Sequence, residues 1–375
     1  MNGIILNWNN ADHRAIYLRQ LKEQPLYYDQ NLKVWVVYSY EFCKALLLDE
    51  NAYVPEPVID DNGPMNDKMK LLLRKLARIS NNEQHLASRE AAMTIFQRIN
   101  AVSVDQVLEQ LLNGADAERG FDWVEVVGKR LPILLILRGL GFNDEDCSYI
   151  TANLPKLVRV MLPNKTVEDI EAIDPVVNGI YEITERYIIS SGLSAEQPEK
   201  TELIICNLLG LFIQCYDAGR GLLCNALLSL ARQRDKRQTN KNDIAFYKDL
   251  VTETLRLDPP VHNTRRVAVR DICLGGEIIR AGETIQIVLA AANLDPDVFK
   301  DPDKFDLTRS NNEQHLTFGL GGHNCIARYL STGMTANTCR FLENKYQNIN
   351  ILQKELSYEP QLNVRLVKQL MVNLS

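Results

Sequence analysis

Apolar residues recur at helical spacing through most of the first two-thirds of the chain. Residues 107–112, 124–138 and 181–189 each place apolar side chains every three or four positions, and this pattern predicts helices. Residues 200–232 continue the pattern over a much longer stretch and predict one long helix. Because the apolar faces of this helix are broad, we expect it to run through the interior of the protein.

The last third of the chain mixes short strand-like runs with turns. Residues 266–269 and 284–289 have the apolar and β-branched content of strands, and glycine turns separate them. A further helix is predicted from Cys325 to about Phe341, and residues 364–372 are expected to form strand and turn. The pattern therefore predicts a mainly α protein with small β-sheets, an α+β fold.

Length and composition are those of a large folded protein. The chain has 375 residues, 46% of them hydrophobic and 24% charged, which is ample for a large core. No proline- or serine-rich linker and no internal repeat divides it, so we expect a single catalytic domain over residues 1–375. The net charge of −6 argues against a nucleic-acid partner, because phosphate binding needs a basic surface.

The cysteines and the apolar runs bear on the cellular compartment. None of the eight cysteines forms a Cys-x-x-Cys pair, so a zinc or iron–sulfur site is not expected. We expect all except Cys325 to be small buried hydrophobes in a reducing compartment. Residues 1–10 lack the basic segment of a signal peptide, and the longest uncharged apolar run, 203–216, is too short to cross a bilayer. We expect a soluble, cytoplasmic protein with no membrane partner.

Cys325 lies in the segment Phe318-Gly-Leu-Gly-Gly-His-Asn-Cys-Ile-Ala327, a glycine-rich loop that leads into an apolar helical stretch. We expect the cysteine at the first turn of that helix, where unpaired backbone N–H groups and the macrodipole favour a thiolate. The glycines let the backbone turn sharply and pass close to the sulfur. A thiolate presented in this way suits the axial ligand of a haem iron. The alternative is a buried structural cysteine beside a flexible turn.

The spacing Phe-Gly-x-Gly-x-His-x-Cys resembles the haem-binding loop of the cytochrome P450 family. One position departs from the family, which usually has glycine two residues after the cysteine, where this chain has Ala327. The resemblance implies haem b, buried between the long central helix and the helix after the cysteine loop. It makes Cys325 the ligand of the iron and places Phe318, His323 and Ala327 at the haem.

Glu253 and Arg256 lie three residues apart on one face of a predicted helix that Pro259 and Pro260 end. Taken alone, such a pair is an ordinary surface ion pair of small stabilising effect. The resemblance implies that both residues join Arg309 in a buried charge network. A buried network of this kind is strongly destabilised when one member is removed.

Basic residues elsewhere fit the carboxylates of a haem. His85 and Arg89 lie about one helical turn apart on one face, and Arg266 begins a strand-like run. Guanidinium groups bind carboxylates in bidentate fashion, and histidine adds a further donor. The resemblance implies that these three residues and His323 contact the haem propionates.

The middle of the long helix departs from the resembled family, which commonly has an acid followed by a threonine there. In the family, the two side chains deliver protons during the reduction of dioxygen. One register places Asp217 and Ala218 at these positions, and we favour it because it keeps the following apolar run aligned. A rival register places Gly221 and Leu222 there and leaves no acid. The threonine is absent in both registers.

Loss of the threonine leaves three mechanisms open. A hydroxyl group of the substrate replaces it, Asp217 acts through water molecules alone, or the enzyme uses peroxide or another atypical haem reaction. The question matters because general acid assistance contributes roughly 10²–10⁴ in rate. Nearby Arg220 either binds an acidic substrate or, as we expect, lies on the helix surface or pairs with a neighbouring group.

The resemblance implies a haem-thiolate monooxygenase that oxidises a small organic substrate with O₂. Electrons would come from an NAD(P)H-dependent reductase through a separate ferredoxin or flavodoxin, because the chain has no flavin or iron–sulfur segment. The implied walls of the substrate pocket include Phe212, Tyr216, Val261, His262 and Asn263. His262 and Asn263 would make one wall polar, which suits a functionalised natural product of secondary metabolism. The alternative is that both side chains point away from the haem.

Overall fold

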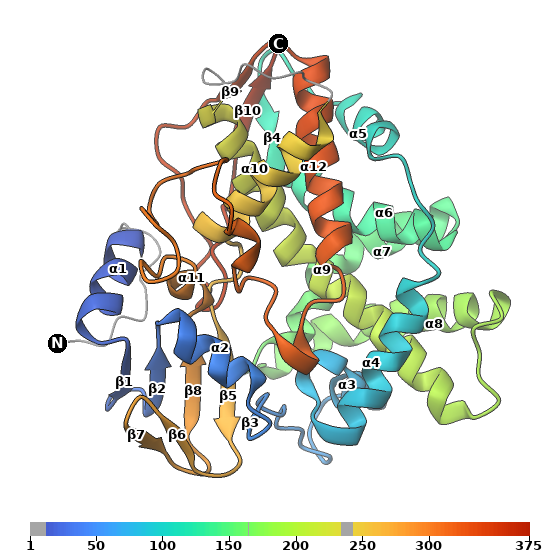
Figure 1. The fold of residues 1–375 in the computed structure, drawn as a ribbon. Helices are drawn as coiled ribbons and strands as arrows, with labels where there is room; N and C mark the ends of the chain where they lie inside the picture. The colour runs from blue at the N-terminus through green and yellow to red at the C-terminus, as the bar shows by residue number, and fades with distance from the viewer. Residues whose placement is uncertain (1–12, 164, 234–242) are drawn as a thin grey trace. The chain divides into compact units, whose positions relative to one another are not determined.

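The computed structural model describes residues 13–163, 165–233 and 243–375, so the prediction for residues 1–10 lies outside the described part of the chain. The chain forms two compact units, whose helices and strands are labelled in Figure 1. Unit 1 comprises residues 1–53, 104–129 and 217–375, and unit 2 comprises residues 54–103 and 130–216. A single catalytic domain over residues 1–375 stays a prediction.

The described elements of unit 2 are helical. They are α3 (Asp67–Lys75), η1 (Ala77–Ile79), α4 (Asn82–Phe96), α6 (Leu131–Leu140), α7 (Asp144–Leu157), η3 (Val158–Met161), α8 (Val167–Ser190) and the first part of α9 (Pro198–Gln233). Local signals fix several of their ends. Thr166 and Asp169 form a reciprocal capping box at the start of α8, and Gly141, with φ of 84°, ends α6.

Unit 1 combines helices with small sheets. Its helices are α1 (His13–Glu23), α2 (Tyr40–Leu48), α5 (Val104–Leu112), η2 (Val124–Gly128), the second part of α9, α10 (Ile244–Leu257), α11 (Leu289–Ala292), η5 (Asn312–Gln314), η6 (Gly321–His323) and α12 (Arg328–Lys345). Its strands are β1 (Leu26–Asp29), β2 (Val34–Val37), β3 (Ala52–Tyr53), β4 (Phe121–Asp122), β5 (Thr264–Ala268), β6 (Ile272–Leu274), β7 (Glu277–Ile279), β8 (Thr284–Ile287), β9 (Ile349–Ile351) and β10 (Met371–Leu374). The predicted mainly α protein with small sheets is confirmed.

The largest sheet has the strand order β1-β2-β8-β5-β3, and β2 and β8 are its one parallel pair among the described strands. The order β4-β10-β9 makes a three-stranded sheet, and β6 and β7 make a two-stranded one. Both predicted strands are present in slightly shifted form, as β5 and β8, paired in antiparallel register from Thr264 opposite Ile287.

Alternation along β2 divides the core of unit 1 into two clusters. Trp35 and Val37 point into a buried cluster that includes Leu46 of α2, whereas Val36 packs into another with Tyr17 of α1. Successive side chains of a strand face opposite sides of the sheet, so one strand can serve two apolar clusters. This arrangement buries both faces of the sheet at β2.

The predicted long helix is confirmed as α9, which runs for 36 residues and belongs in part to each unit. Among the described residues, it is the one helix long and apolar enough to cross a membrane. However, 67% of its most apolar window is buried inside the protein, as in the core helix of a water-soluble protein. The expectation of an interior helix is therefore met.

The prediction of one helix over residues 124–138 is wrong, because the structure divides this segment. A turn of π-helix, η2, ends at Gly128, and α6 begins at Leu131. Pro132 lies in the first turn of α6 and has no N–H to donate to the carbonyl of Gly128, four residues earlier. A continuous helix would lose that bond and bring the proline ring against the preceding turn.

Candidate functional site

The cysteine loop lies between η6 and α12 in unit 1. Cys325 precedes the helix, since α12 begins at Arg328 with Ala327 at its N-cap, so its predicted place in the first turn is wrong. The reason is that the backbone N–H of Cys325 donates to the carbonyl of Phe318 at 2.8 Å, which closes the loop on itself. The residue between η6 and the cysteine, Asn324, is extended. Cys325 still lies just before the N-terminus of the helix.

Two positions in this loop require glycine. Gly319 and Gly321 both have φ of +66°, a backbone conformation that other residues rarely adopt. A Cβ atom on Gly321 would also lie 3.0 Å from the carbonyl oxygen of Leu47, at the end of α2. These glycines therefore fix the course of the loop that presents the thiol.

The thiol of Cys325 is exposed, which separates it from most other cysteines of the chain. Five others are buried, and burial raises their pKa values: Cys43, Cys147, Cys206, Cys224 and Cys339. The expectation that all seven remaining cysteines are buried is wrong for Cys273, which is exposed, while Cys215 is partly buried. Cys273 is the middle residue of β6, whose two neighbours face inward, so alternation turns its side chain to the surface.

Arg266 of β5 is a buried guanidinium without a carboxylate partner among the described residues. Its Nη1 donates to Thr264 Oγ1 at 3.1 Å and to the carbonyl of Arg265 at 2.8 Å. Burial lowers its pKa to about 10. A buried charge is costly unless an opposite charge compensates it. The side chain is therefore suited to an anionic group of a ligand.

Other predicted haem contacts are distributed over both units. In unit 1, His323 ends η6, and the ring of Phe318 lies 5.5 Å from the His315 ring and 5.6 Å from the Arg328 guanidinium. In unit 2, His85 and Arg89 lie on α4, and the Nδ1 of buried His85 donates to the carbonyl of Ala77 at 2.8 Å. Contact of His85, Arg89 and His323 with haem propionates stays a prediction, and so does the place of Phe318 at the haem.

These features of unit 1 fit a haem. An exposed thiol on a tightly turned loop is available as an axial ligand, and Cys325 would hold the iron. The buried guanidinium of Arg266 would find its missing counter-charge in a propionate carboxylate. Ala327, at the N-cap of α12, adds only a methyl group where the family usually has glycine.

The structure brings Glu253, Arg256 and Arg309 together. Two nitrogens of Arg256 donate to the two carboxylate oxygens of Glu253 at 2.7 and 2.8 Å, and both side chains are 0% exposed. The remaining donors of Arg256 reach the backbone carbonyls of Asn293, Pro302 and Lys304. The Nε atom of Arg309 lies 3.5 Å from Glu253 Oε1. The predicted network is thus a closed set of buried hydrogen bonds.

On α9, Asp217 and Ala218 are both partly buried. The Nη2 atom of Arg220 lies 3.0 Å from Asp217 Oδ1, and its Nη1 atom lies 3.7 Å from Glu359 Oε1. The Arg220 side chain is only 6% exposed, so its predicted place on the helix surface is wrong, whereas the expected pairing is present. Sequence reasoning missed Glu359, because no motif surrounds it and it is remote in sequence from Arg220.

The predicted pocket residues are placed as follows. In unit 2, Phe212 and Tyr216 are buried on α9. In unit 1, Val261 forms an isolated bridge with Val364, and Asn263 Nδ2 donates to the carbonyl of Leu362 at 2.8 Å. His262 is fully buried, with Nδ1 2.9 Å from the hydroxyl of Tyr17. Contact of these residues with a substrate stays a prediction.

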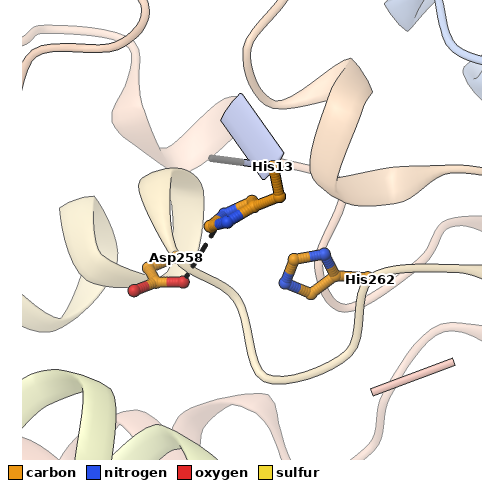
Figure 2. A group of neighbouring side chains, drawn as sticks. All are labelled: His13, Asp258 and His262. Carbon is orange, nitrogen blue, oxygen red and sulfur yellow. Dashed lines mark ion pairs between the residues drawn. The ribbon is translucent and has the colours of Figure 1, made fainter. Parts of the chain in front are cut away.

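His262 belongs to a cluster with His13 and Asp258, which Figure 2 shows as three neighbouring side chains. Three such groups are a possible metal-binding set, and His13 Nε2 lies 3.8 Å from Asp258 Oδ1. However, Arg14 and Arg365 lie 3.8 and 3.4 Å from the same carboxylate. Two guanidinium groups already compensate the one negative charge, so the cluster is poorly suited to a divalent cation.

The electrostatics of this cluster agree with a structural role. Burial acts to raise the pKa of Asp258, but Arg365, His13 and Arg14 outweigh it and hold that pKa below its usual value. Burial lowers the pKa of His262 well below its usual value, and the neighbouring positive charges act in the same direction. A neutral His262 and an ionised Asp258 tie the start of α1 to the end of α10.

Comparison with known proteins gives one consistent family. Residues 228–339, which include the Glu253–Arg256 pair and the cysteine loop, match the family model "Cytochrome P450". The "Biotin biosynthesis cytochrome P450" of Bacillus subtilis is 24% identical over 93% of this chain and 92% of its own length. "Cytochrome P450 119" of Sulfurisphaera tokodaii is 29% identical over 89% of this chain and 92% of its own length.

A solved structure shows the same fold. P450BioI, in complex with an acyl carrier protein ligated to hexadec-9Z-enoic acid, matches 97% of this chain and 99% of its own with a TM-score of 0.82 and 22% identity. Members of the family bind haem b and act as monooxygenases. With these matches and with a thiol loop and a buried guanidinium that fit a haem, the chain belongs to the cytochrome P450 family.

Proposed function

We propose that this haem-b monooxygenase oxidises a small functionalised organic molecule, of the natural-product kind, that carries a hydroxyl group near the position of oxidation. The observation that supports the proposal is Ala218, which follows Asp217 where the family commonly has threonine. Alanine neither donates a hydrogen bond nor orders a water molecule. A hydroxyl of the substrate would supply the missing donor.

The chain's own residues have distinct parts in this proposal. Haem b supplies the chemistry of dioxygen reduction and substrate oxidation when it is bound. Cys325 would hold it through the thiolate, and Arg266 would compensate the charge of a propionate. Asp217 accepts a proton from solvent water and passes it on through water and the substrate hydroxyl. General acid assistance of this kind contributes roughly 10²–10⁴ in rate.

The proposal extends to the electron donor and the compartment. Electrons would arrive from NAD(P)H through a separate reductase and a ferredoxin or flavodoxin. The sequence has no Cys-x-x-Cys motif for an iron–sulfur cluster of its own. A cytoplasmic location is supported by five buried thiols, which suit a reducing compartment.

The substrate proposal is tested with pairs of hydroxylated natural products and their deoxy analogues. Binding is followed by the shift of the haem Soret band, and turnover by product formed per NADPH with a generic ferredoxin system. We expect the hydroxylated member of a productive pair to give a clearly higher yield of product per NADPH. Equal yields for both members of every bound pair would contradict the proposed role of the hydroxyl.

The same assay examines a second candidate function, a peroxide-driven enzyme, which the absence of threonine also favours. Such an enzyme would turn over the bound compounds with hydrogen peroxide and give little product with ferredoxin and NADPH. Ligation is tested separately with Cys325→Ala. The reduced carbon monoxide complex of the parent should show the strongly red-shifted Soret band of thiolate ligation, and the variant should lose it.

A further inference from the structure

We propose that Arg220 is a positioning residue for proton delivery, because it holds the Asp217 carboxylate in one orientation on α9. This inference rests on the proposed function, in which Asp217 is the distal acid. Asp217 and Arg220 are three residues apart, so their side chains leave the helix on neighbouring positions of one face. The distance of 3.0 Å between Arg220 Nη2 and Asp217 Oδ1 is that of a close ion pair.

Packing holds the backbone of Arg220 in place. A Cβ atom on Gly128 of η2 would lie 3.5 Å from the Cβ of Arg220, so the main chain of η2 covers the base of the side chain. The next residue, Gly221, brings α9 against Pro260 and Leu366, where an added Cβ atom would lie 2.6 and 2.7 Å from their side chains. The helix therefore has little freedom to rotate or shift at this point.

Glu359 lies near the other terminal nitrogen of the Arg220 guanidinium. Its Oε1 atom lies 3.7 Å from Arg220 Nη1, and its own backbone N–H donates to the carbonyl of Leu366 at 2.8 Å. Two carboxylates therefore share one guanidinium, and the charge of Arg220 is already compensated. This arrangement leaves no net positive charge to bind an acidic substrate, so the alternative role of Arg220 in substrate binding is disfavoured.

The solvent exposure of Asp217, Arg220 and Glu359 suits proton exchange. The Arg220 side chain is 6% exposed, but those of Asp217 and Glu359 are each 29% exposed. Water can therefore reach both carboxylates while the arginine stays fixed between them. A proton taken from water by Asp217 breaks the ion pair for the time of transfer, and the pair re-forms once the proton has passed on. Arg220 returns the carboxylate to the same orientation each time.

The experiment combines Arg220→Gln, Asp217→Asn and the double variant in the haem-loaded protein. The readouts are NADPH consumed and hydrogen peroxide released with a generic ferredoxin and its reductase, in H₂O and D₂O, with dodecan-1-ol as the probe. Arg232→Gln is the matched control, because Arg232 lies exposed near the end of the same helix. The carbon monoxide spectrum reports that each variant has folded and holds haem.

We expect Arg220→Gln to slow turnover roughly 10-fold, since small displacements of a catalytic group have effects of this order. It should also increase the solvent isotope effect and the share of electrons released as peroxide. In the Asp217→Asn background, Arg220→Gln should add less than about twofold, because coupled residues are not additive. Arg220→Lys should restore part of the activity, and Arg232→Gln should match the parent.

The outcomes separate this inference from the proposed function. If Asp217→Asn is slow while Arg220→Gln equals the parent, the inference is overturned and the distal acid stands. Equal slowing by Arg220→Gln in the parent and in the Asp217→Asn background also overturns it, since the arginine would then act independently. Parent-like turnover of Asp217→Asn overturns both. If Arg220→Gln does not hold haem, Arg220→Lys and Glu359→Gln replace it in the comparison. Parent-like turnover in both of these variants overturns the inference. Slower turnover in either one supports the inference if the slowing disappears in the Asp217→Asn background.

Discussion

The pairs Glu253–Arg256 on α10 and Asp217–Arg220 on α9 have the same spacing and the same charges, but their surroundings differ. Both members of the α10 pair are 0% exposed, and backbone carbonyls take the other donors of Arg256. The α9 pair buries its arginine but leaves the carboxylate 29% exposed. An acid–arginine pair that water cannot reach stabilises the fold, whereas a pair that water can reach is suited to proton exchange.

The largest expected effect is on the α10 pair. Glu253→Ala or Arg256→Ala leaves a buried charge without its partner, which should lower the free energy of unfolding by roughly 3–5 kcal/mol and abolish haem incorporation. Arg220→Ala should cost less, about 1–3 kcal/mol, because solvent reaches the carboxylates that it leaves. Denaturant unfolding and haem content measure both. Equal losses of unfolding free energy for the two pairs would contradict the distinction between a pair that stabilises the fold and a pair that exchanges protons.

A second test concerns the packing that fixes the α9 pair. Gly221→Ala places a methyl group against Pro260 and Leu366 and should lower the free energy of unfolding by about 1–3 kcal/mol. The control is Gly333→Ala on α12, where an added Cβ atom meets no described heavy atom within 4 Å. That change should stabilise the helix by up to about 1 kcal/mol. A stabilising Gly221→Ala would show that α9 is not closely held beside Arg220.

A third test uses pH, because the surroundings of the α10 pair include a buried histidine. Burial lowers the pKa of His315 to about 3, and the charges of Arg328 and Arg256 act in the same direction. Below about pH 6.5 the unfolded chain takes up a proton at His315 that the folded protein does not. The free energy of unfolding should therefore fall by about 1.4 kcal/mol per pH unit from about pH 6.5 towards pH 3, with the full contribution present above pH 6.5.

Denaturant unfolding at about pH 5.5 and pH 4.5 measures this slope, because both values lie below the usual histidine pKa of about 6.5. His315 Nδ1 accepts the backbone N–H of Thr317 at 3.3 Å, so His315→Asn keeps an acceptor and removes the titrating group. The variant should lose about 1.4 kcal/mol per pH unit of the parent's slope, while buried His262 contributes its own part in the same direction. An unchanged slope in His315→Asn would contradict the assignment.

The smallest expected effect belongs to Ala218, beside the exchanging pair. Ala218→Thr adds a hydroxyl next to Asp217, and for a substrate without a hydroxyl of its own it should raise product per NADPH about twofold or more. For a substrate that supplies its own hydroxyl, the change should be neutral or harmful, since the added volume crowds it. No change in coupling or in substrate binding for either class would place Ala218 away from the proton path.

The sequence by itself determined features that depend on residues close together in the chain. The glycine loop around Cys325, the end of α10 before Pro259 and the length of α9 follow from local backbone preferences and from a repeating apolar pattern. These features need no distant partner, because dihedral freedom, the missing N–H of proline and helical periodicity act over a few residues. The pairing of Glu253 with Arg256 was predictable for the same reason.

Only the tertiary structure decided features that depend on residues far apart in the chain. Arg220 is buried, and it contacts Glu359, which comes much later in the sequence. Arg266 is buried because β5 lies inside a sheet, and Cys273 is exposed because β6 turns its middle residue outward. The sequence shows which side chains are charged. Solvent access and residues distant in the chain decide whether a charged side chain stabilises the fold, contacts a ligand or exchanges protons.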